Sequence, residues 1–211
     1  ATITNPNSAT TTVTDFSING TYELIWTVNG CSDAIMITVG DDCNCPIIGN
    51  IINTPTPSSY CESVSSVIIS GQVANPAGGD YEWYYSFNSG AFALALGVNN
   101  QQDYTTSTLS IGEHRFQRKY TTTSGIICDD LSNMVTINVY PNPIASIIGG
   151  DDICPGKETI FTATGGVSYL WSNTATTAAI NVNNSDIYSV TVTDINGCQD
   201  IATKSVMVYP Q

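Results

Sequence analysis

The side chains that could do chemistry are scarce in this sequence, and histidine is the scarcest. His114 is the only histidine among 211 residues, so a catalytic triad or a cysteine–histidine pair would have to use it. It falls in a predicted strand, where a repeated pattern described below places a core aromatic residue in the other copies. The carboxylates form no close pair with separate acid and base roles. We therefore expect His114 to be structural and the chain not to be an enzyme.

Cysteine is the second candidate for chemistry. The chain has seven cysteines, most of them tens of residues apart, which is typical of proteins that mature in an oxidising compartment. Cys43 and Cys45 have a spacing that suits a metal, but a single histidine and no second close thiol pair leave a four-ligand zinc site incomplete. We expect disulfides and a secreted protein. The odd number leaves at least one thiol without a partner inside the chain.

Aspartates recur at fixed positions. Asp33, Asp130 and Asp200 each lie two residues after a cysteine, and two acidic pairs lie near the ends of predicted units. Carboxylates grouped with backbone carbonyls are the oxygen ligands that calcium prefers. Aspartates in turns also bond nearby backbone N–H groups, and the chain has no contiguous calcium loop, so both interpretations stay open. The calcium candidates are Asp33, Asp41, Asp42, Asp130, Asp151, Asp152 and Asp200, and no other cofactor is expected.

Three of the five basic residues share one predicted strand: Arg115, Arg118 and Lys119. This patch is predicted either to contact an anion or glycan, or to form salt bridges on an exposed face. The chain as a whole carries a formal net charge of −13, with a pI near 4.1. Nucleic acid is excluded as a partner because it requires Lys and Arg to neutralise phosphates. No apolar run approaches the ~18 residues of a membrane span.

The elements that must position these residues are short strands. The chain is 42% hydrophobic and only 11% charged, so it can bury cores. Three segments repeat a strand, a turn, the sequence Cys-x-Asp and a second strand, clearly at 20–39 and 186–209 and more loosely at 114–140. Apolar residues fall at every second position in the clear copies, the period of a strand with one buried face. Asn29-Gly30 and Asn196-Gly197 supply tight hairpin turns.

A second shared pattern precedes the two later hairpins: a cysteine, a strand, a glycine-rich turn and a strand that carries tryptophan. With about seven short strands per unit, this pattern is typical of an immunoglobulin-like sandwich. We predict an all-β fold of tandem immunoglobulin-like antiparallel β-sandwiches. The predicted units are 1–42, the C-terminal part of one repeat, and two complete repeats at 43–141 and 142–211.

The predicted core contains one tryptophan per unit. Tyr22 and Tyr188 suit the position of a tyrosine corner, which His114 or Phe116 takes in the middle unit. The predicted core residues are Trp26, Trp83, Trp171, Tyr22 and Tyr188. Because the first unit is incomplete, it would expose half a core, and such an edge is adhesive. We expect the missing half to come from preceding sequence or from strands donated by another copy, which makes self-assembly a prediction.

Geometry distinguishes two ways of pairing the cysteines. Pairs within units would join Cys61 to Cys128 and Cys154 to Cys198. In a sandwich, however, these positions lie at opposite ends, roughly 20 Å apart at about 3.3 Å per residue, whereas a disulfide requires Cα atoms about 4.4–6.8 Å apart. We therefore favour bridges that cross junctions and stiffen them, with pairs within units as the alternative. Within the chain, these bridges join Cys61 to Cys198, and Cys128 to Cys43 or Cys45. The other linker cysteine then bonds the missing part of the first unit. Cys31 and Cys154 bond units outside this chain.

The residues of the last unit show a resemblance. The segments Tyr169-Leu-Trp171-Ser-Asn-Thr-Ala-Thr-Thr and Tyr188-Ser-Val-Thr-Val-Thr-Asp-Ile-Asn-Gly-Cys198 resemble the PKD-like and Ig-like repeats of large Bacteroidota surface proteins. Those proteins include gliding-motility adhesins, are exported by the type IX secretion system and form long repeat arrays on the cell. The resemblance implies a stalk or adhesive segment outside the cell with no active site.

Two functions are weighed on this basis. The first is a structural and adhesive repeat segment of a large cell-surface protein, a stalk or filament whose partners are neighbouring repeats. The second is a carbohydrate- or protein-binding accessory module of a secreted hydrolase. An exposed aromatic platform beyond the core tryptophans would favour the second, and Tyr84, Tyr104 and Tyr120 are its candidates.

Overall fold

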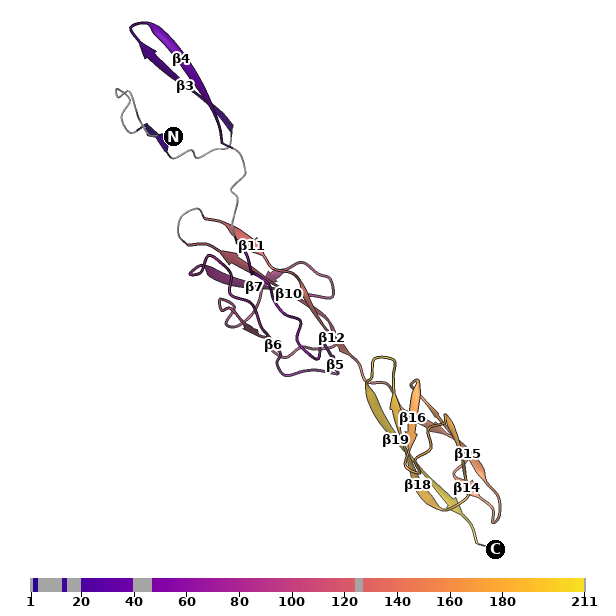
Figure 1. The fold of residues 1–211 in the computed structure, drawn as a ribbon. Coiled ribbons are helices and arrows are strands. Elements are labelled where there is room, and N and C mark those ends of the chain that lie inside the picture. The colour runs from indigo at the N-terminus through magenta and orange to yellow at the C-terminus, as the bar shows by residue number, and fades with distance from the viewer. Residues whose placement is uncertain (1, 4–12, 15–19, 40–46, 124–126, 211) are drawn as a thin grey trace.

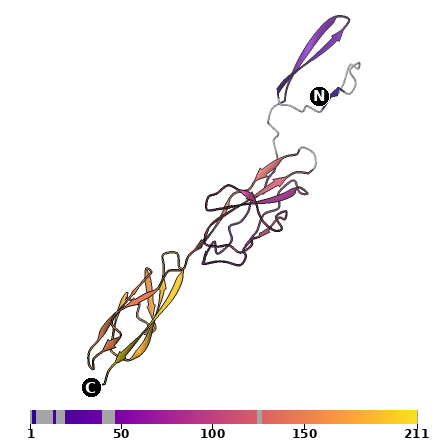
Figure 2. The ribbon, with the colours of Figure 1, turned by 180° about the vertical axis from the view of Figure 1, so that it is seen from behind.

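The structure is a computed structural model, and it describes residues 2–3, 13–14, 20–39, 47–123 and 127–210. Every regular element in these ranges is a β-strand, which confirms the all-β prediction. The strands build two sandwiches and a separate hairpin, and the sandwiches follow one another end to end (Figure 1 and Figure 2). No helix in these ranges has the length and apolar character needed to cross a membrane.

The middle unit packs one large sheet against a small second layer. Its strands are β5 (Ser59–Cys61), β6 (Ile68–Ile69), β7 (Asp80–Phe87), β8 (Ala93–Leu94), β9 (Tyr104–Thr105), β10 (Gly112–Thr121), β11 (Asp129–Leu131) and β12 (Val135–Tyr140). The large sheet has the order β5-β12-β10-β7-β8, and β11 pairs with the second half of β10. β6 and β9 form the second layer, and the core lies between this layer and the large sheet.

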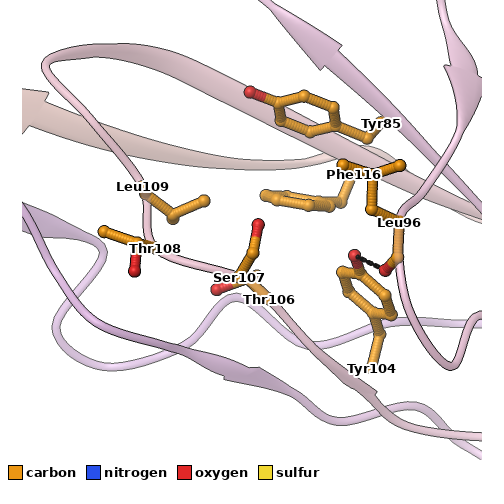
Figure 3. Close-up of a pocket in the computed structure, with 8 residues that line it drawn as sticks. All are labelled: Tyr85, Leu96, Tyr104, Thr106, Ser107, Thr108, Leu109 and Phe116. Carbon is orange, nitrogen blue, oxygen red and sulfur yellow. Dashed lines mark hydrogen bonds between the residues drawn. The ribbon is translucent and has the colours of Figure 1, made fainter.

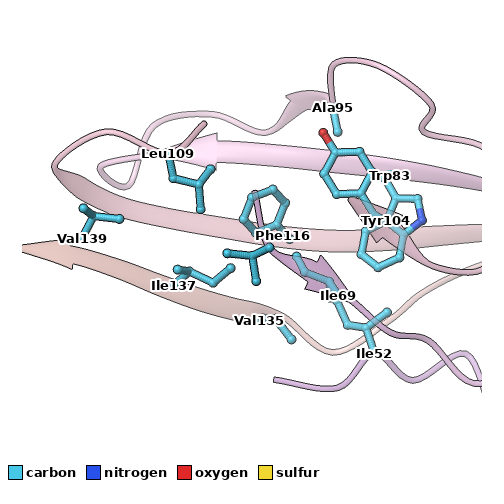
Figure 4. Packing of buried hydrophobic residues seen from close by; sticks show 11 residues of the cluster. Ile52, Ile69, Trp83, Ala95, Tyr104, Leu109, Phe116, Val135, Ile137 and Val139 are labelled. Carbon is cyan, nitrogen blue, oxygen red and sulfur yellow. The ribbon is translucent and has the colours of Figure 1, made fainter. Parts of the chain in front are cut away.

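Trp83 lies in this core with none of its surface exposed. Its Nε1 donates a hydrogen bond to the Gln101 carbonyl at 2.8 Å, so the buried indole keeps a polar partner. Inward residues alternate with outward ones along β10 and β12, as the strand period requires. Figure 4 shows the hydrophobic core side chains between the layers. The core comprises Ile52, Val67, Ile69, Trp83, Ala95, Tyr104, Leu109, Phe116, Val135, Ile137 and Val139.

The last unit repeats this plan with two more even sheets. Its strands are β13 (Ser146–Ile148), β14 (Asp152–Ile153), β15 (Thr159–Thr164), β16 (Ser168–Trp171), β17 (Ala179–Val182), β18 (Asp186–Thr193) and β19 (Gln199–Val208). The sheets have the orders β13-β15-β17 and β14-β19-β18-β16. Trp171 is buried and donates its Nε1 hydrogen bond to the Thr177 carbonyl at 2.9 Å. Tyr188 is half-buried, and its ring meets Phe161 edge-on.

Each sandwich has one parallel pair among its antiparallel ladders. β5 runs parallel to β12, and β14 runs parallel to β19. Cys61 therefore lies opposite Tyr140, and Ile153 lies opposite Val208. This register places Cys61 and Cys154 beside the end of the last strand of their own units.

The first segment is described as two short strands and a hairpin. These are β1 (Thr2–Ile3), β2 (Val13–Thr14), β3 (Gly20–Val28) and β4 (Cys31–Val39). Trp26 faces Asp33 across the hairpin as Val192 faces Asp200 in the last unit, so β3–β4 is the equivalent of β18–β19. Val192 is buried, whereas Trp26 is 39% exposed, and the prediction of Trp26 as a core residue is wrong for this structure. The physical reason is that β3 and β4 pair only with each other among the described strands, so no second layer covers the indole.

Candidate functional site at the junction of two units

A disulfide between Cys61 and Cys198 joins the middle unit to the last one. The Cα atoms are 5.6 Å apart, and the two residues are separated by 137 positions in the sequence. This is one of the pairings expected to cross a junction. Because Cys61 and Cys198 bond each other, neither pair within a unit forms. The bond is the feature of this chain that most needs a functional explanation, since it links two separate cores.

The position of Cys61 follows from the parallel pairing of β5 with β12. Cys61 lies opposite Tyr140, and the backbone N–H of Glu62 donates a hydrogen bond to the Tyr140 carbonyl at 2.7 Å. β12 ends at Tyr140, and the chain then passes through Pro141 and Pro143 into the last unit. Cys61 is therefore held where the chain leaves the middle unit.

The position of Cys198 follows from the turn between β18 and β19. Gly197 has a φ of 86°, a value that favours glycine. One carboxylate oxygen of Asp194 accepts hydrogen bonds from the backbone N–H groups of Asn196 and Cys198, each at 2.8 Å. Sequence reasoning missed Asp194, although an aspartate just before an Asn-Gly turn is a known turn-forming signal. The turn fixes the direction in which the Cys198 thiol points.

The repeated aspartate fastens the start of each complete unit to its final hairpin. Asp200 Oδ2 accepts a hydrogen bond from the Ala145 N–H at 2.9 Å, and Oδ1 accepts one from the Ile201 N–H at 2.8 Å. These two bonds, the Ala145 bond first, hold the pKa of Asp200 below its ordinary value. In the middle unit the Asn50 amide donates to the Asp130 carbonyl at 2.8 Å and to its carboxylate at 3.2 Å.

Asp33 takes the corresponding place in the first hairpin. Its carboxylate accepts a hydrogen bond from the Ala34 N–H at 2.9 Å, as Asp200 does from Ile201. Backbone N–H groups thus engage the carboxylates of Asp33 and Asp200, and the Asn50 side-chain amide engages that of Asp130.

The other calcium candidates are dispersed. Asp151 lies 3.8 Å from the Lys204 amine, and Asp152 interacts with Tyr209, whose pKa is raised by the charge of Asp152 and by their hydrogen bond. Asp41 and Asp42 lie outside the described residues. Among the residues that the structure describes, no three His, Cys, Asp or Glu side chains are grouped so that they could hold a metal ion.

Three further cysteines lie within the described residues. Cys154 directly follows β14 and is exposed, and Cys31 begins β4 and is exposed as well. Neither forms a disulfide with another described residue. Cys128 is buried, and its N–H donates a hydrogen bond to Thr122 Oγ1 at 2.8 Å. Cys43 and Cys45 lie outside the described residues.

The basic strand divides its side chains between the core and the surface. Lys119 forms a salt bridge with Asp129 at 2.8 Å, and Arg115 forms one with Glu113 at 3.4 Å, as the salt-bridge interpretation expects. Arg118 fits neither interpretation, because it is fully buried. Its guanidinium donates hydrogen bonds to Asn50 Oδ1 at 3.0 Å and to two backbone carbonyls, those of Gln102 at 2.6 Å and Gln72 at 2.7 Å.

His114 is buried and has both ring nitrogens engaged. Nε2 donates to the Ser110 carbonyl at 2.7 Å, and Nδ1 lies 2.9 Å from the Tyr85 hydroxyl. Because a carbonyl can only accept, Nε2 carries a proton, and Nδ1 shares the second hydrogen bond with the Tyr85 hydroxyl. The bond to the backbone four residues upstream is of the kind that defines a tyrosine corner. Tyr188 makes no such bond among the described residues.

A small cavity opens between the layers of the middle unit beside His114. It has a volume of about 170 Å³. Figure 3 shows the aromatic rings of Tyr85, Tyr104 and Phe116 around it, with the Tyr104 hydroxyl bonded to the Leu96 carbonyl at 2.7 Å. Two of the three candidates for an exposed aromatic platform are buried, since Tyr104 and Tyr120 are 3% and 1% exposed. Tyr84 is half-buried, with its hydroxyl hydrogen-bonded to Glu82.

No protein-family model matches the sequence, and no curated protein matches it. Three solved structures illustrate what the fold is similar to. A Ca²⁺-stabilized adhesin with which an Antarctic bacterium reaches out and binds ice is 14% identical, with a TM-score of 0.43, over 90% of this chain and 56% of that one. An amphioxus IgVJ-C2 molecule is 12% identical, with a TM-score of 0.38, over 70% and 99% of the two chains. Fibronectin(III)-like modules of Clostridium thermocellum CbhA are 11% identical, with a TM-score of 0.36, over 75% and 93%.

These similarities concern the fold alone. The two cores and their sheets make the described structure a tandem array of immunoglobulin-like β-sandwiches.

Proposed function

We propose that this chain is a structural and adhesive repeat segment of a large secreted cell-surface protein, a stalk without catalytic activity. The observation that carries the proposal is the Cys61–Cys198 disulfide. Successive domains joined by one short linker swing relative to each other by default. A covalent bond beside the linker gives the junction a second point of attachment. A chain whose junctions are attached at two points acts as a stiff rod, which suits a stalk.

The same bond and the sequence support the proposed compartment and parent class. Disulfides persist in extracellular and periplasmic environments and are rare in a reducing cytosol. The sequence pattern around Trp171 and Cys198 resembles repeats of gliding-motility adhesins exported by type IX secretion in Bacteroidota. We assign the chain to that kind of repeat array on the cell surface, with neighbouring repeats as its main partners.

The absence of catalysis is part of the proposal. The only histidine has both nitrogens bonded within the middle unit, so it is not available as a base. The carboxylates of the hairpin aspartates, which recur most regularly, accept hydrogen bonds from backbone N–H groups at Asp33 and Asp200 and from the Asn50 side chain at Asp130. Nothing among the described residues combines a nucleophile, a base and an open cleft.

Small-angle X-ray scattering tests the rigidity of the junction. The double variant Cys61→Ser/Cys198→Ser removes the bond and keeps both cores, while Thr176→Ser changes an exposed side chain that takes no part in the bond. We expect the double variant to give a broadened distribution of interatomic distances and a variable maximum dimension, and Thr176→Ser to scatter like the original chain. Identical scattering from all three proteins would contradict the stalk proposal, because the bond would then add no stiffness.

One observation favours the second candidate, a protein-binding accessory module. Phe92, Leu94 and Leu96 are exposed on and beside the edge strand β8, and Leu96 also lines the small cavity. Exposed apolar groups at a sheet edge are a common protein contact. Binding of candidate surface proteins and glycans that is weakened by Leu96→Asp, and not by Val167→Asp in the last unit, would support this role.

A further inference from the structure

The exposed thiol of Cys154 occupies the position that is bonded in the neighbouring unit. Cys61 lies opposite Tyr140 at the end of the parallel pair β5–β12. In the last unit Ile153 lies opposite Val208 in the parallel pair β14–β19, and the Tyr209 N–H donates to the Ile153 carbonyl at 3.0 Å. Cys154 follows Ile153 and is therefore beside Tyr209, as Cys61 is beside Tyr140. The two cysteines hold the same register in their units.

The exposed thiol of Cys31 occupies the position of the other bonding partner. It directly follows Asn29-Gly30, as Cys198 follows Asn196-Gly197, and the register of β3–β4 repeats that of β18–β19. Gly30 and Gly197 have φ values of 80° and 86°, although the first turn has two residues between Val28 and Cys31 and the second has one residue more between Asp194 and Cys198. Cys31 and Cys154 thus repeat, at the two ends of the chain, the positions that Cys198 and Cys61 occupy in the bonded junction.

We propose that Cys154 of one chain forms a disulfide with Cys31 of a second copy. The second copy would place its β3–β4 turn on the end of the last unit as β18–β19 is placed on the end of the middle unit. The inference extends the proposed stalk function from one chain to an assembly and rests on it. Both residues are exposed in the described structure, so the contact requires no rearrangement of a core.

The bond forms by thiol–disulfide exchange with a small-molecule disulfide such as glutathione disulfide. The Cys154 thiolate attacks that disulfide, forms a mixed disulfide and releases one glutathione thiolate. The Cys31 thiolate then attacks the Cys154 sulfur and releases the second glutathione. Two protein thiols are oxidised to one disulfide, one glutathione disulfide is reduced to two thiols, and the two protons pass to the glutathione thiolates.

The symmetry of the contact determines the product. Cys31 and Cys154 lie on different units, so the contact joins two unlike surfaces. Each bonded pair of copies keeps one unbonded Cys31 surface and one unbonded Cys154 surface, to which further copies can attach. Unlike surfaces that do not close into a ring build an open chain. The expected assembly is a head-to-tail filament whose junctions between copies repeat the junction inside each copy.

The test mixes two variants of the full chain, Cys31→Ser and Cys154→Ser, in a glutathione redox buffer. Only one Cys31 and one Cys154 are then available per pair, and the product is a dimer. Disulfide mapping by mass spectrometry counts the mixed Cys31–Cys154 link against the two symmetrical links. We expect the mixed link in at least about fivefold excess over each symmetrical link, where random pairing gives about twofold. The unmodified chain should form a ladder of longer oligomers on a non-reducing gel.

A relocated thiol is the matched control. Cys31→Ser/Cys154→Ser/Thr176→Cys moves the thiol of the last unit to an exposed loop on its side, and mixed with Cys154→Ser it should give links at the random ratio. The Cys61–Cys198 link, read in the same spectra, shows that the stalk junction has formed in every sample. Random ratios for the Cys31–Cys154 pair, or glutathionylated monomers alone, would overturn the inference and leave the stalk proposal standing if that internal link is intact.

Discussion

Arg118 shows how a charged side chain becomes part of a sandwich core. It lies in β10 on the same side as His114, Phe116 and Tyr120, at every second position, and all four side chains are buried. The guanidinium lies over the Tyr81 ring, 4.4 Å from its centroid, and burial is the main cause that lowers the pKa of Arg118. Its hydrogen bonds reach loops on both sides of the strand, so one side chain ties together residues near 50, 72 and 102.

Replacing this side chain should destabilise the middle unit strongly. Arg118→Met keeps the volume and leaves two part-buried carbonyls and the buried Asn50 amide oxygen without their donor, which we expect to cost about 3 kcal/mol. Urea unfolding followed by tryptophan fluorescence measures the change. Lys119→Met, next in the sequence and exposed, is the control and should have a much smaller effect. Equal effects of the two variants would show that the buried hydrogen bonds of Arg118 add little.

Asp200 gives the last unit a predictable pH dependence. Its pKa is lowered in the folded state from an ordinary 3.8, chiefly by the Ala145 N–H, so the ionised form stabilises the fold. That contribution is complete above the unfolded pKa and is lost as the pH falls through the lower folded pKa. We expect Asp200→Asn to be less stable than the original chain near neutral pH and the difference to shrink below 3.8. Thermal unfolding at a series of pH values measures this, and a constant difference would contradict the assignment.

At the scale of elements, the final hairpins were the most predictable part of the fold. The Asn-Gly turns and period-two alternation indicate β3–β4 and β18–β19, because turn chemistry and strand period are local properties. The same period places Arg118 on the inward side with Phe116, although its charge argues for the surface. The partners of the hairpin aspartates, Asn50 and Ala145, lie in segments whose path depends on tertiary packing, and local patterns do not reveal them. The small cavity likewise depends on the loop from Leu96 to Leu109.

Equivalent positions in the two hairpins should respond differently to substitution. Val192→Ala removes buried methyl groups from the core of the last unit and should cost about 2 kcal/mol. Trp26→Ala removes a larger but exposed side chain and should change the stability of the described chain by less than about 0.5 kcal/mol. Chemical denaturation of both variants decides the comparison. A large loss for Trp26→Ala would mean that the indole is covered in solution.

At the scale of the whole molecule, the Cys61–Cys198 disulfide should stabilise the last unit against unfolding, although the bond lies outside that unit's hydrophobic core. If the last unit unfolds while the middle unit stays folded, its chain remains attached both at the linker and at Cys61, which restricts the unfolded ensemble. We expect Cys61→Ser/Cys198→Ser to destabilise the last unit by about 2–4 kcal/mol. Calorimetry of the chain with the bond and of the variant without it provides the measurement, and Thr176→Ser is the control. Unchanged transitions would indicate that the restriction is negligible.

The position of the bond also determines how the chain carries tension. When the two ends are pulled apart, the load enters the middle unit, crosses from Cys61 to Cys198 through the sulfur atoms and leaves along β19. The intervening residues are out of the load path, even though they make up most of both sandwiches. The bond spans 137 positions, and at about 3.5 Å per extended residue some 480 Å of chain is withheld from stretching. Under oxidising conditions the molecule can therefore bear tension while this part of the chain stays unextended. Reduction of the disulfide would allow the same part of the chain to unfold and extend.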